Sequence, residues 1–352
     1  MRAGYRITID GRNVTDNFDP HLIALTLTDN DGGRTDTLEI TIDDTEGRIA
    51  LPRAGAQIQA AIWWIEPPPW GTNKAIQFQG VTDEPESSGS RGGGMVLQIT
   101  AHSADLKGKG KEKVEKHKDK KKFKDIASQW GDDAGYQVKV ADELGSIERD
   151  YWVMANESFL SWGRRIAEEM GATFKTAYPK AVFLPRNSSS SASGQSLEQL
   201  YVVRDHNLIA WRLTPVQDRS VYKRANVRWY DRKKAKWNKE QVEIGGQDGS
   251  VDITETFKFA DKERAKNRAT SNSDEAKRGK GGGEIRIDGD ARARSQVDCL
   301  VQGIRSGIDG MWRVTIARHT YTRDGGWTTS CDVEQPQEGG QGGGQSGQGS
   351  RG

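Results

Sequence analysis

Residues 35–66, TDTLEITIDDTEGRIALPRAGAQIQAAIWWIE, contain the pattern that decides the fold class of this chain. Apolar side chains occupy every second position in two runs of the stretch. These positions are Leu38, Ile40 and Ile42, then Ile58, Ala60, Ile62 and Trp64. A period of two places such side chains on one face of a β-strand, and the polar residues and Gly47 between the runs are typical of a turn. The stretch therefore predicts two half-buried strands in the wall of a barrel or sandwich.

The flanking residues continue this pattern. Residues 4–15, GYRITIDGRNVT, predict a hairpin that turns at Asp10-Gly11. The cluster 29–33, DNDGG, resembles part of a calcium loop, but the acid expected at the fifth position of that pattern is missing, so we predict a hairpin turn. Residues 1–104 are therefore predicted to form a first antiparallel, barrel-like β domain.

A different pattern begins near residue 105 and predicts a small α/β module over 105–186. One helix is expected from the spacing of Phe123, Ile126, Ala127 and Trp130, with Gly131 as its stop. A second helix is expected to begin at an Asn156 N-cap and to end at Gly171. Its apolar stripe consists of Phe159, Trp162, Ile166, Ala167 and Met170.

The rest of the chain predicts a second barrel-like β domain over 187–335. A Ser-rich linker, 187–199, precedes strands that resume at Tyr201, and a surface helix is expected near 257–278. Residues 336–352 consist almost entirely of Gly, Gln and Ser, so we expect a disordered tail. The predicted fold class is α+β and mainly β, with two barrel-like antiparallel domains and an α/β module between them.

Composition restricts the functional classes. The 352 residues carry a net charge of only +2, which argues against a strongly basic nucleic-acid binder. Cys299 and Cys331 are too few for a disulfide framework, and the five histidines show no metal-ligand spacing. We expect no cleavable signal, no membrane insertion and folding in a reducing cytoplasm.

A lysine-rich run stands out within the central module. Ten lysines lie between Lys107 and Lys124, against three acids. Such a run could face phosphates, because clustered lysines release counterions from nucleic acid. No aromatic residue interleaves with the lysines before Phe123, so base stacking is not indicated. We favour a solvated, poorly ordered loop that leads into an exposed helix start.

No nucleotide-binding, hydrolase or redox motif occurs in the sequence. Glu143 and Asp150, near Tyr151, could be proposed as paired glycosidase carboxylates, but their spacing favours a solvated loop. His319 lies in an alternating strand with no nucleophile pattern, which favours a structural or interface histidine. We therefore predict a protein that is not an enzyme, with no catalytic, cofactor-binding or metal-binding residues.

Four segments, in order, resemble the phage late control D family of baseplate or tail hub proteins. The first is TDTLEITIDDTEGRIALPRAGAQIQ, and the second is SADLKG at the start of the module. The third, ESFLSWGRRIAEEMGATFKTAYPKAVFLP, is also similar to the hub portion of type VI secretion spikes. The fourth comprises the closing strands from EIRIDGD to TTSCDVE. Together the resemblance covers about residues 5–334.

The resemblance implies a structural role in a contractile tail. Such hubs are homotrimers in which two barrel-like domains per subunit form a ring that adapts the sixfold tail tube to the threefold spike and lets DNA pass. The implied partners are the central spike, the tail tube or distal tail protein, the tape-measure protein and other baseplate components, with transient DNA contact in the bore. The implied location is the virion baseplate, assembled in the host cytoplasm. The family pattern supplies no catalytic residues.

Two other function classes stay open at this point. One is a tail-associated peptidoglycan hydrolase, although no lysozyme or peptidase motif is recognisable. The other is a nucleic-acid-binding module that acts through the lysines between Lys107 and Lys124.

Overall fold

The computed structural model describes residues 1–335 except 33, 186–196, 215–221, 232–233, 244–250, 260–261, 263–264, 267, 271 and 273–280. The first part contains β1 (Arg2–Ile9), β2 (Arg12–Asn13), α1 (Thr15–Phe18), β3 (Leu22–Asn30), β4 (Thr37–Asp43), β5 (Gln57–Glu66), β6 (Ile76–Thr82), β7 (Glu86–Ser90) and β8 (Gly94–His102). The middle part contains η1 (Lys109–Lys111), β9 (Val114–Lys122), α2 (Phe123–Asp133), β10 (Gln137–Val140), α3 (Asp142–Gly145), β11 (Glu148–Glu157), α4 (Phe159–Glu169), β12 (Ala172–Ala177) and β13 (Lys180–Pro185). The last part contains β14 (Leu200–Val203), β15 (Leu208–Thr214), β16 (Tyr222–Asp231), β17 (Lys236–Glu243), β18 (Val251–Phe259), β19 (Gly282–Asp288), β20 (Asp298–Gln302), β21 (Gly310–Thr322) and β22 (Gly326–Glu334).

The predicted alternation in residues 35–66 is confirmed by β4 and β5. Leu38, Ile40 and Ile42 are fully buried on β4, and β5 buries Ile58 and Ile62 in the same core. The two strands are not neighbours, however, because β4 pairs with β3 and β8, whereas β5 pairs with β1 and β6. The hairpin at Asp10-Gly11 is also confirmed, since β1 pairs with β2 around two positive-φ residues.

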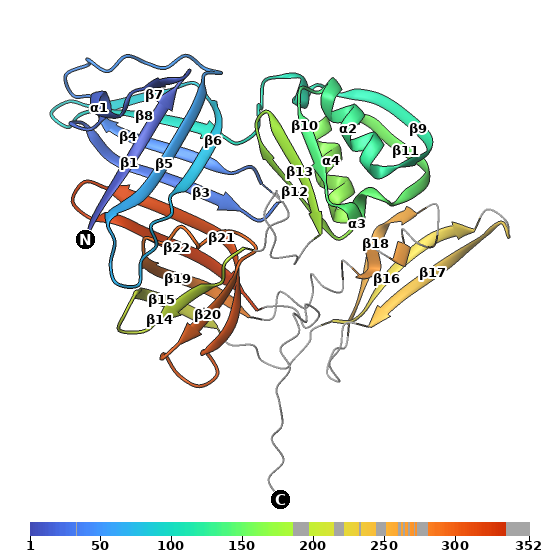
Figure 1. Ribbon diagram of the computed structural model, residues 1–352. Coiled ribbons are helices and arrows are strands. Elements are labelled where there is room, and N and C mark those ends of the chain that lie inside the picture. The colour runs from blue at the N-terminus through green and yellow to red at the C-terminus, as the bar shows by residue number, and fades with distance from the viewer. Residues whose placement is uncertain are drawn as a thin grey trace, which may run out of the picture.

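A single large sheet connects the two ends of the chain. Its main path runs β15-β19-β22-β21-β3-β4-β8-β6-β5-β1-β2, and Figure 1 shows β21 beside β3 at the centre of this body. The antiparallel β3–β21 register runs from Ile316↔Asn30 to Thr322↔Ala24. The predicted mainly β fold class is confirmed, but the sequence did not indicate that the two end regions share one sheet.

The hydrophobic core follows this sheet across both ends of the chain. Trp327 from β22 packs in the cluster built mainly by the first eight strands, with its ring 5.5 Å from that of Trp64. The rings of Tyr5 and Tyr321 are 4.9 Å apart. A second cluster fills the space between β14, β19, β20, β21 and β22. Residues of the last part of the chain therefore help to bury the side chains of residues 1–104.

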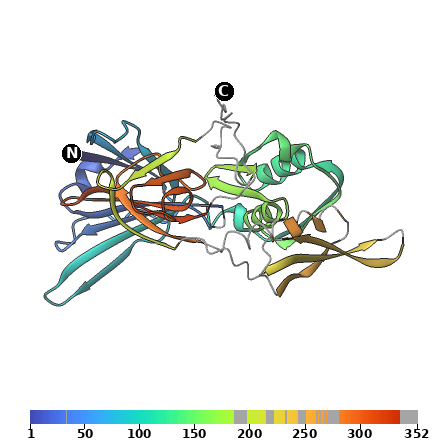
Figure 2. The ribbon, with the colours of Figure 1, turned by 90° about the horizontal axis from the view of Figure 1, so that it is seen from below.

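The α/β module contains a three-stranded sheet, β10-β13-β12, and a two-stranded ribbon, β11-β9, around α2 and α4 (Figure 2). Phe123, Trp130, Trp152, Trp162 and Phe183 form its aromatic core. No helix among the described residues is long and apolar enough to cross a membrane.

Three local predictions in this module were wrong. The N-cap of α4 is Ser158, whose Oγ accepts from the Ser161 amide, whereas Asn156 has a φ of 50° inside the ribbon. Gly131 does not stop α2, which continues to Asp133, and a Cβ at Gly131 would clash with the Val138 side chain, so the glycine is needed for packing. The lysine run is not a loop, since most of it forms η1 and β9.

Strands β16, β17 and β18 form a separate sheet, which lies below the α/β module in the view of Figure 1. Ala265 and Ala269 pack fully buried against Val227 of this sheet. The helix expected near 257–278 overlaps β18, and only scattered helical residues between 262 and 272 are described. The 336–352 tail and most of the 187–199 linker lie outside the described residues. The proposed division into domains stays a prediction.

Candidate functional site

A cavity of about 620 Å³ lies where the large sheet meets the α/β module. Its walls come from β3, β6, the β10-β13-β12 sheet and the segment between β19 and β20. Leu27, Phe78, Val138 and Leu184 contribute apolar surface, and several charged side chains converge at one end. A largely apolar cavity with a few converging polar groups is the usual form of a binding site.

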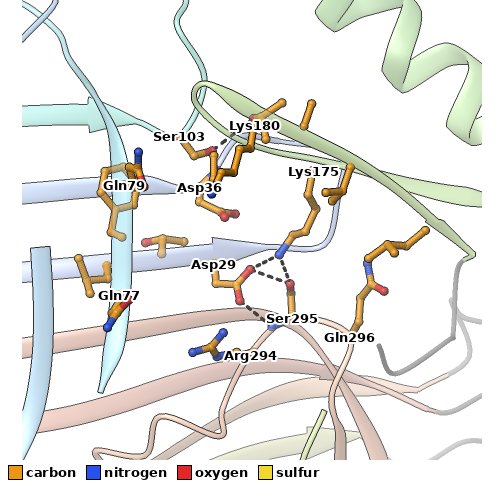
Figure 3. Close-up of a pocket in the computed structure, with 18 of the residues that line it drawn as sticks. Asp29, Asp36, Gln77, Gln79, Ser103, Lys175, Lys180, Arg294, Ser295 and Gln296 are labelled. Atoms are coloured by element: carbon orange, nitrogen blue, oxygen red, sulfur yellow. Dashed lines mark hydrogen bonds and ion pairs between the residues drawn. The ribbon is translucent and has the colours of Figure 1, made fainter. Parts of the chain in front are cut away.

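Asp29, Lys175 and Ser295 meet at this end and join three distant parts of the chain (Figure 3). Asp29 is the next-to-last residue of β3, Lys175 projects from β12, and Ser295 lies in the segment before β20. Lys175 Nζ forms an ion pair with Asp29 Oδ1 and donates to Ser295 Oγ over 2.7 Å. Ser295 Oγ donates in turn to Asp29 Oδ1 over 2.7 Å, and the Ser295 amide donates to Asp29 Oδ2 over 3.2 Å.

Neighbouring side chains extend this network. Gln296 Nε2 donates to Asp31 Oδ1 over 2.8 Å. Asp36, just before β4, accepts from the Asn30 amide at Oδ1 over 2.9 Å. The Asp36 amide donates to Ser103 Oγ over 3.0 Å. Hydrogen bonds therefore hold Asp36 through both its carboxylate and its backbone amide.

The charges of Asp29 and Lys175 stabilise each other. Burial raises the pKa of Asp29, but the charge of Lys175 and the hydrogen bonds from Lys175 and Ser295 outweigh it and hold the pKa below its usual range. Burial likewise lowers the pKa of Lys175, and the nearby Asp29 and Asp36 carboxylates more than reverse this effect. The pair is therefore ionised in the folded protein.

Asp36 behaves in the opposite way. Burial raises its pKa to about 7, because the attraction of Lys175 does not compensate for lost hydration and for the repulsion of Asp29. The Lys175 ammonium group thus lies near two carboxylates, and it stabilises the negative charge of Asp29 more than that of Asp36.

His319 on β21 lies behind this network and is fully buried. Its Nε2 lies 2.9 Å from the Ala293 carbonyl, which can only accept, so Nε2 carries the proton and donates. Nδ1 then accepts from Thr329 Oγ1 over 3.0 Å. Burial lowers the pKa of His319 to about 4, so the ring is neutral near pH 7. The expected structural role of His319 is confirmed by this geometry.

The Ser295–Lys175 contact resembles a nucleophile beside a base, but the protonation states oppose that chemistry. A general base must accept the serine proton. Lys175 is protonated, Ser295 already donates to Asp29, and both ring nitrogens of His319 are occupied. The arrangement instead fixes β3, β12 and the segment before β20 relative to one another.

The carboxylates considered from the sequence lie elsewhere. Glu143 and Asp150 are exposed on α3 and β11, and neither lines the cavity. Asp29 and Asn30 of the acidic cluster end β3, and the oxygens of Asp29 and Asp31 accept from Lys175, Ser295 and Gln296. The part of the chain that the structure describes holds no cluster of three or more metal-ligating side chains.

Sequence reasoning missed the junction of Asp29, Lys175 and Ser295 altogether. Its members are separated by 120 to 266 residues, and no short motif connects them. A lysine within the apolar strand text TFKTA was the one local signal.

The lysine run between Lys107 and Lys124 does not line the cavity. β9 pairs with β11 from Glu148↔Lys122 to Glu157↔Val114. Lys118 and Lys120–122 are exposed, whereas Lys116 pairs with Asp133 over 2.6 Å. The pairing also brings exposed Tyr151 beside His117, with ring centroids 5.9 Å apart.

Comparison with curated proteins yields two phage relatives. The chain is 28% identical over 249 residues to the probable baseplate hub protein of Escherichia phage 186, covering 69% of this chain and 60% of the relative. It is 27% identical over 239 residues to the probable baseplate hub protein of Escherichia phage P2, covering 67% and 58%. The chain thus spans less than two thirds of each relative. No family model matches the chain.

Comparison with solved structures finds the same fold in tail proteins. The 43 kDa tail protein of prophage MuSo2 from Shewanella oneidensis aligns with a TM-score of 0.68 at 13% identity, over 95% of this chain and 98% of that one. The tail protein from Neisseria meningitidis MC58 aligns with a TM-score of 0.67 at 11% identity, over 95% and 97%. The E. coli c3393 protein, a component of the type VI secretion system, aligns with a TM-score of 0.54 at 9% identity, over 96% and 78%. By sequence this chain is related to phage baseplate hub proteins and by fold to phage tail proteins, which confirms the family resemblance.

Proposed function

We propose that this chain is a structural hub subunit of a phage or phage-like tail baseplate. The observation that carries the proposal is the continuous sheet that joins both end regions through β3 and β21. A subunit built in this way offers one rigid wall with a strand at each end, which suits a ring assembled from several copies. The relationship to hub proteins of phages 186 and P2 supports the same role.

The finer features of the proposal come from the family resemblance. The subunits form a homotrimer whose ring adapts a sixfold tail tube to a threefold spike and lets DNA pass. Its partners are the spike, the tube or distal tail protein, the tape-measure protein and other baseplate components. The protein resides in the virion baseplate after assembly in the host cytoplasm and performs no catalysis.

Mass measurement tests this proposal directly. The purified chain is analysed by light scattering after size-exclusion chromatography, alone and with a spike protein from the same source. A mass of three chains, with ring-shaped particles in negative-stain images, is the expected result. A mass of one chain under both conditions, at every concentration, would contradict it. A zymogram on the same sample tests peptidoglycan hydrolysis, for which we expect no cleared band.

A further inference from the structure

Strand β15 forms one end of the large sheet, and its outer edge carries no partner strand among the described residues. β15 pairs with β19 on one side only, from Leu208↔Ile287 to Thr214↔Gly282. Figure 1 shows it at the border of the sheet body, away from the α/β module. A free edge presents unpaired amide and carbonyl groups to any strand that approaches.

The side chains of this edge strand are unusually apolar for their exposure. Ile209 is 48% exposed and Trp211 is 42% exposed. Trp211 is opposite Ile285, which is itself opposite Cys331, and both of these are fully buried. The row of core residues therefore continues outward to Trp211, where its cover ends. The Arg204 guanidinium lies 5.9 Å from the Trp211 ring centroid and covers only part of it.

Other edges of this protein are protected against such pairing. The β9 edge consists largely of exposed lysines, and β7 has the sequence ESSGS with every residue exposed. Lysines and polar residues on edge strands discourage contact with other chains, because pairing would bury their charges or polar groups. β15 has only Arg212 and Thr214 in this role, with one register shift in its ladder between Leu208 and Ala210. The composition of β15 is typical of an edge strand that another strand covers.

Three of the segments outside the described residues contain little apolar surface for this cover. Residues 336–352 contain no aliphatic or aromatic residue, and 186–196 contain one alanine among Ser, Gly, Asn, Gln and Arg. Residues 215–221, PVQDRSV, follow β15 directly and contain two valines. Covering a tryptophan and an isoleucine requires a larger apolar partner than these three segments supply.

We propose that the free edge of β15 pairs with a strand of a second copy of this chain, with Ile209 and Trp211 packed into the contact. This inference rests on the proposed hub function, and it names the surface through which copies associate. The chain already uses this kind of joint internally, where β3 from the first region pairs with β21 from the last. Repeating a strand-to-strand joint between copies extends the same sheet from one subunit to the next and closes a ring.

The test compares three forms of the full chain by light scattering over a concentration series. The wild-type chain is expected to associate, and the double variant Ile209→Lys, Trp211→Glu is expected to associate at least tenfold more weakly. Tyr151→Glu is the matched control, because Tyr151 is 46% exposed on β11 of the α/β module. This variant is expected to associate as the wild-type chain does. Circular dichroism and thermal melting establish that all three forms are folded.

Residue-level amide exchange supplies a second readout that needs no substitution. Exchange at the β15 amides that face away from β19 is expected to slow at least tenfold when the wild-type chain associates. Association of the double variant at wild-type strength, or unchanged exchange at β15 in the wild-type assembly, would overturn the inference and leave the hub function standing. The inference would also be overturned if the double variant still self-associates but no longer binds a different protein. A wild-type chain that stays monomeric with its spike would instead contradict the hub function itself.

Discussion

Replacing Lys175 with Met tests the junction between the large sheet and the α/β module. Lys175 is the ammonium group that Asp29 and Asp36 share, and the substitution leaves both partly buried carboxylates beside an apolar side chain of similar length, where the Asp29 side chain is only 18% exposed. Removing one partner of a buried ion pair costs about 3–5 kcal/mol, because the other charge stays buried without compensation. At about 2–4 °C per kcal/mol for larger domains, this loss lowers the melting temperature by roughly 6–20 °C.

Urea unfolding at pH 7.5, followed by tryptophan fluorescence, measures the loss. Lys180→Met is the matched control, since Lys180 is an exposed lysine of the same cavity wall and should change the free energy of unfolding by less than about 0.5 kcal/mol. Adding Asp29→Asn to Lys175→Met should restore much of the stability, because one buried charge is then removed. A loss below about 1 kcal/mol for Lys175→Met would refute the argument that this ion pair holds the junction together.

Two further predictions concern Asp36 and the start of α4. The folded state keeps the Asp36 proton up to about pH 7, whereas an unfolded aspartate releases it near 3.8, so the free energy of unfolding should fall as pH rises between these values. Asp36→Asn should remove this contribution, and urea unfolding at pH 5 and pH 8 should show the variant gaining stability relative to wild type at the higher pH; an equal difference at both values would contradict the burial of this carboxyl. Ser158→Ala should cost about 1 kcal/mol by removing the α4 N-cap. Asn156→Gly should cost nothing measurable in the same assay, because its φ of 50° suits glycine, and a larger loss than for Ser158→Ala would restore Asn156 as the cap.

Local patterns predicted the strands and helices well where burial alternates regularly. The apolar positions of β4, β5, α2 and α4 are buried as their spacing indicated. The same patterns do not specify which strand lies beside which, and so the β3–β21 pairing was not predicted. Such a pairing depends on contacts between residues far apart in the chain.

The lysine run shows a different limit of sequence reasoning. β9 contains no alternating apolar residues after Val114, and its strand conformation depends on pairing with β11. The exposed Tyr151 was also not recognised as a neighbour of the run, because it lies 34 residues after His117, with α2, β10 and α3 between them. The junction of Asp29, Lys175 and Ser295 could not be predicted for the same physical reason: tertiary contacts, and no local propensity, bring its members together.

The pairing of β3 with β21 also affects how the chain is made. The hydroxyls of Thr26 and Thr320 are 3.3 Å apart in the finished sheet, yet 294 residues separate them. At about 5–20 residues per second, a ribosome needs roughly 15–60 s to synthesise that interval. Throughout this time the nascent β3 has an open edge that can capture a neighbouring nascent chain. Biosynthesis of this protein should therefore depend on holdase chaperones, or on well-spaced ribosomes, until β21 emerges.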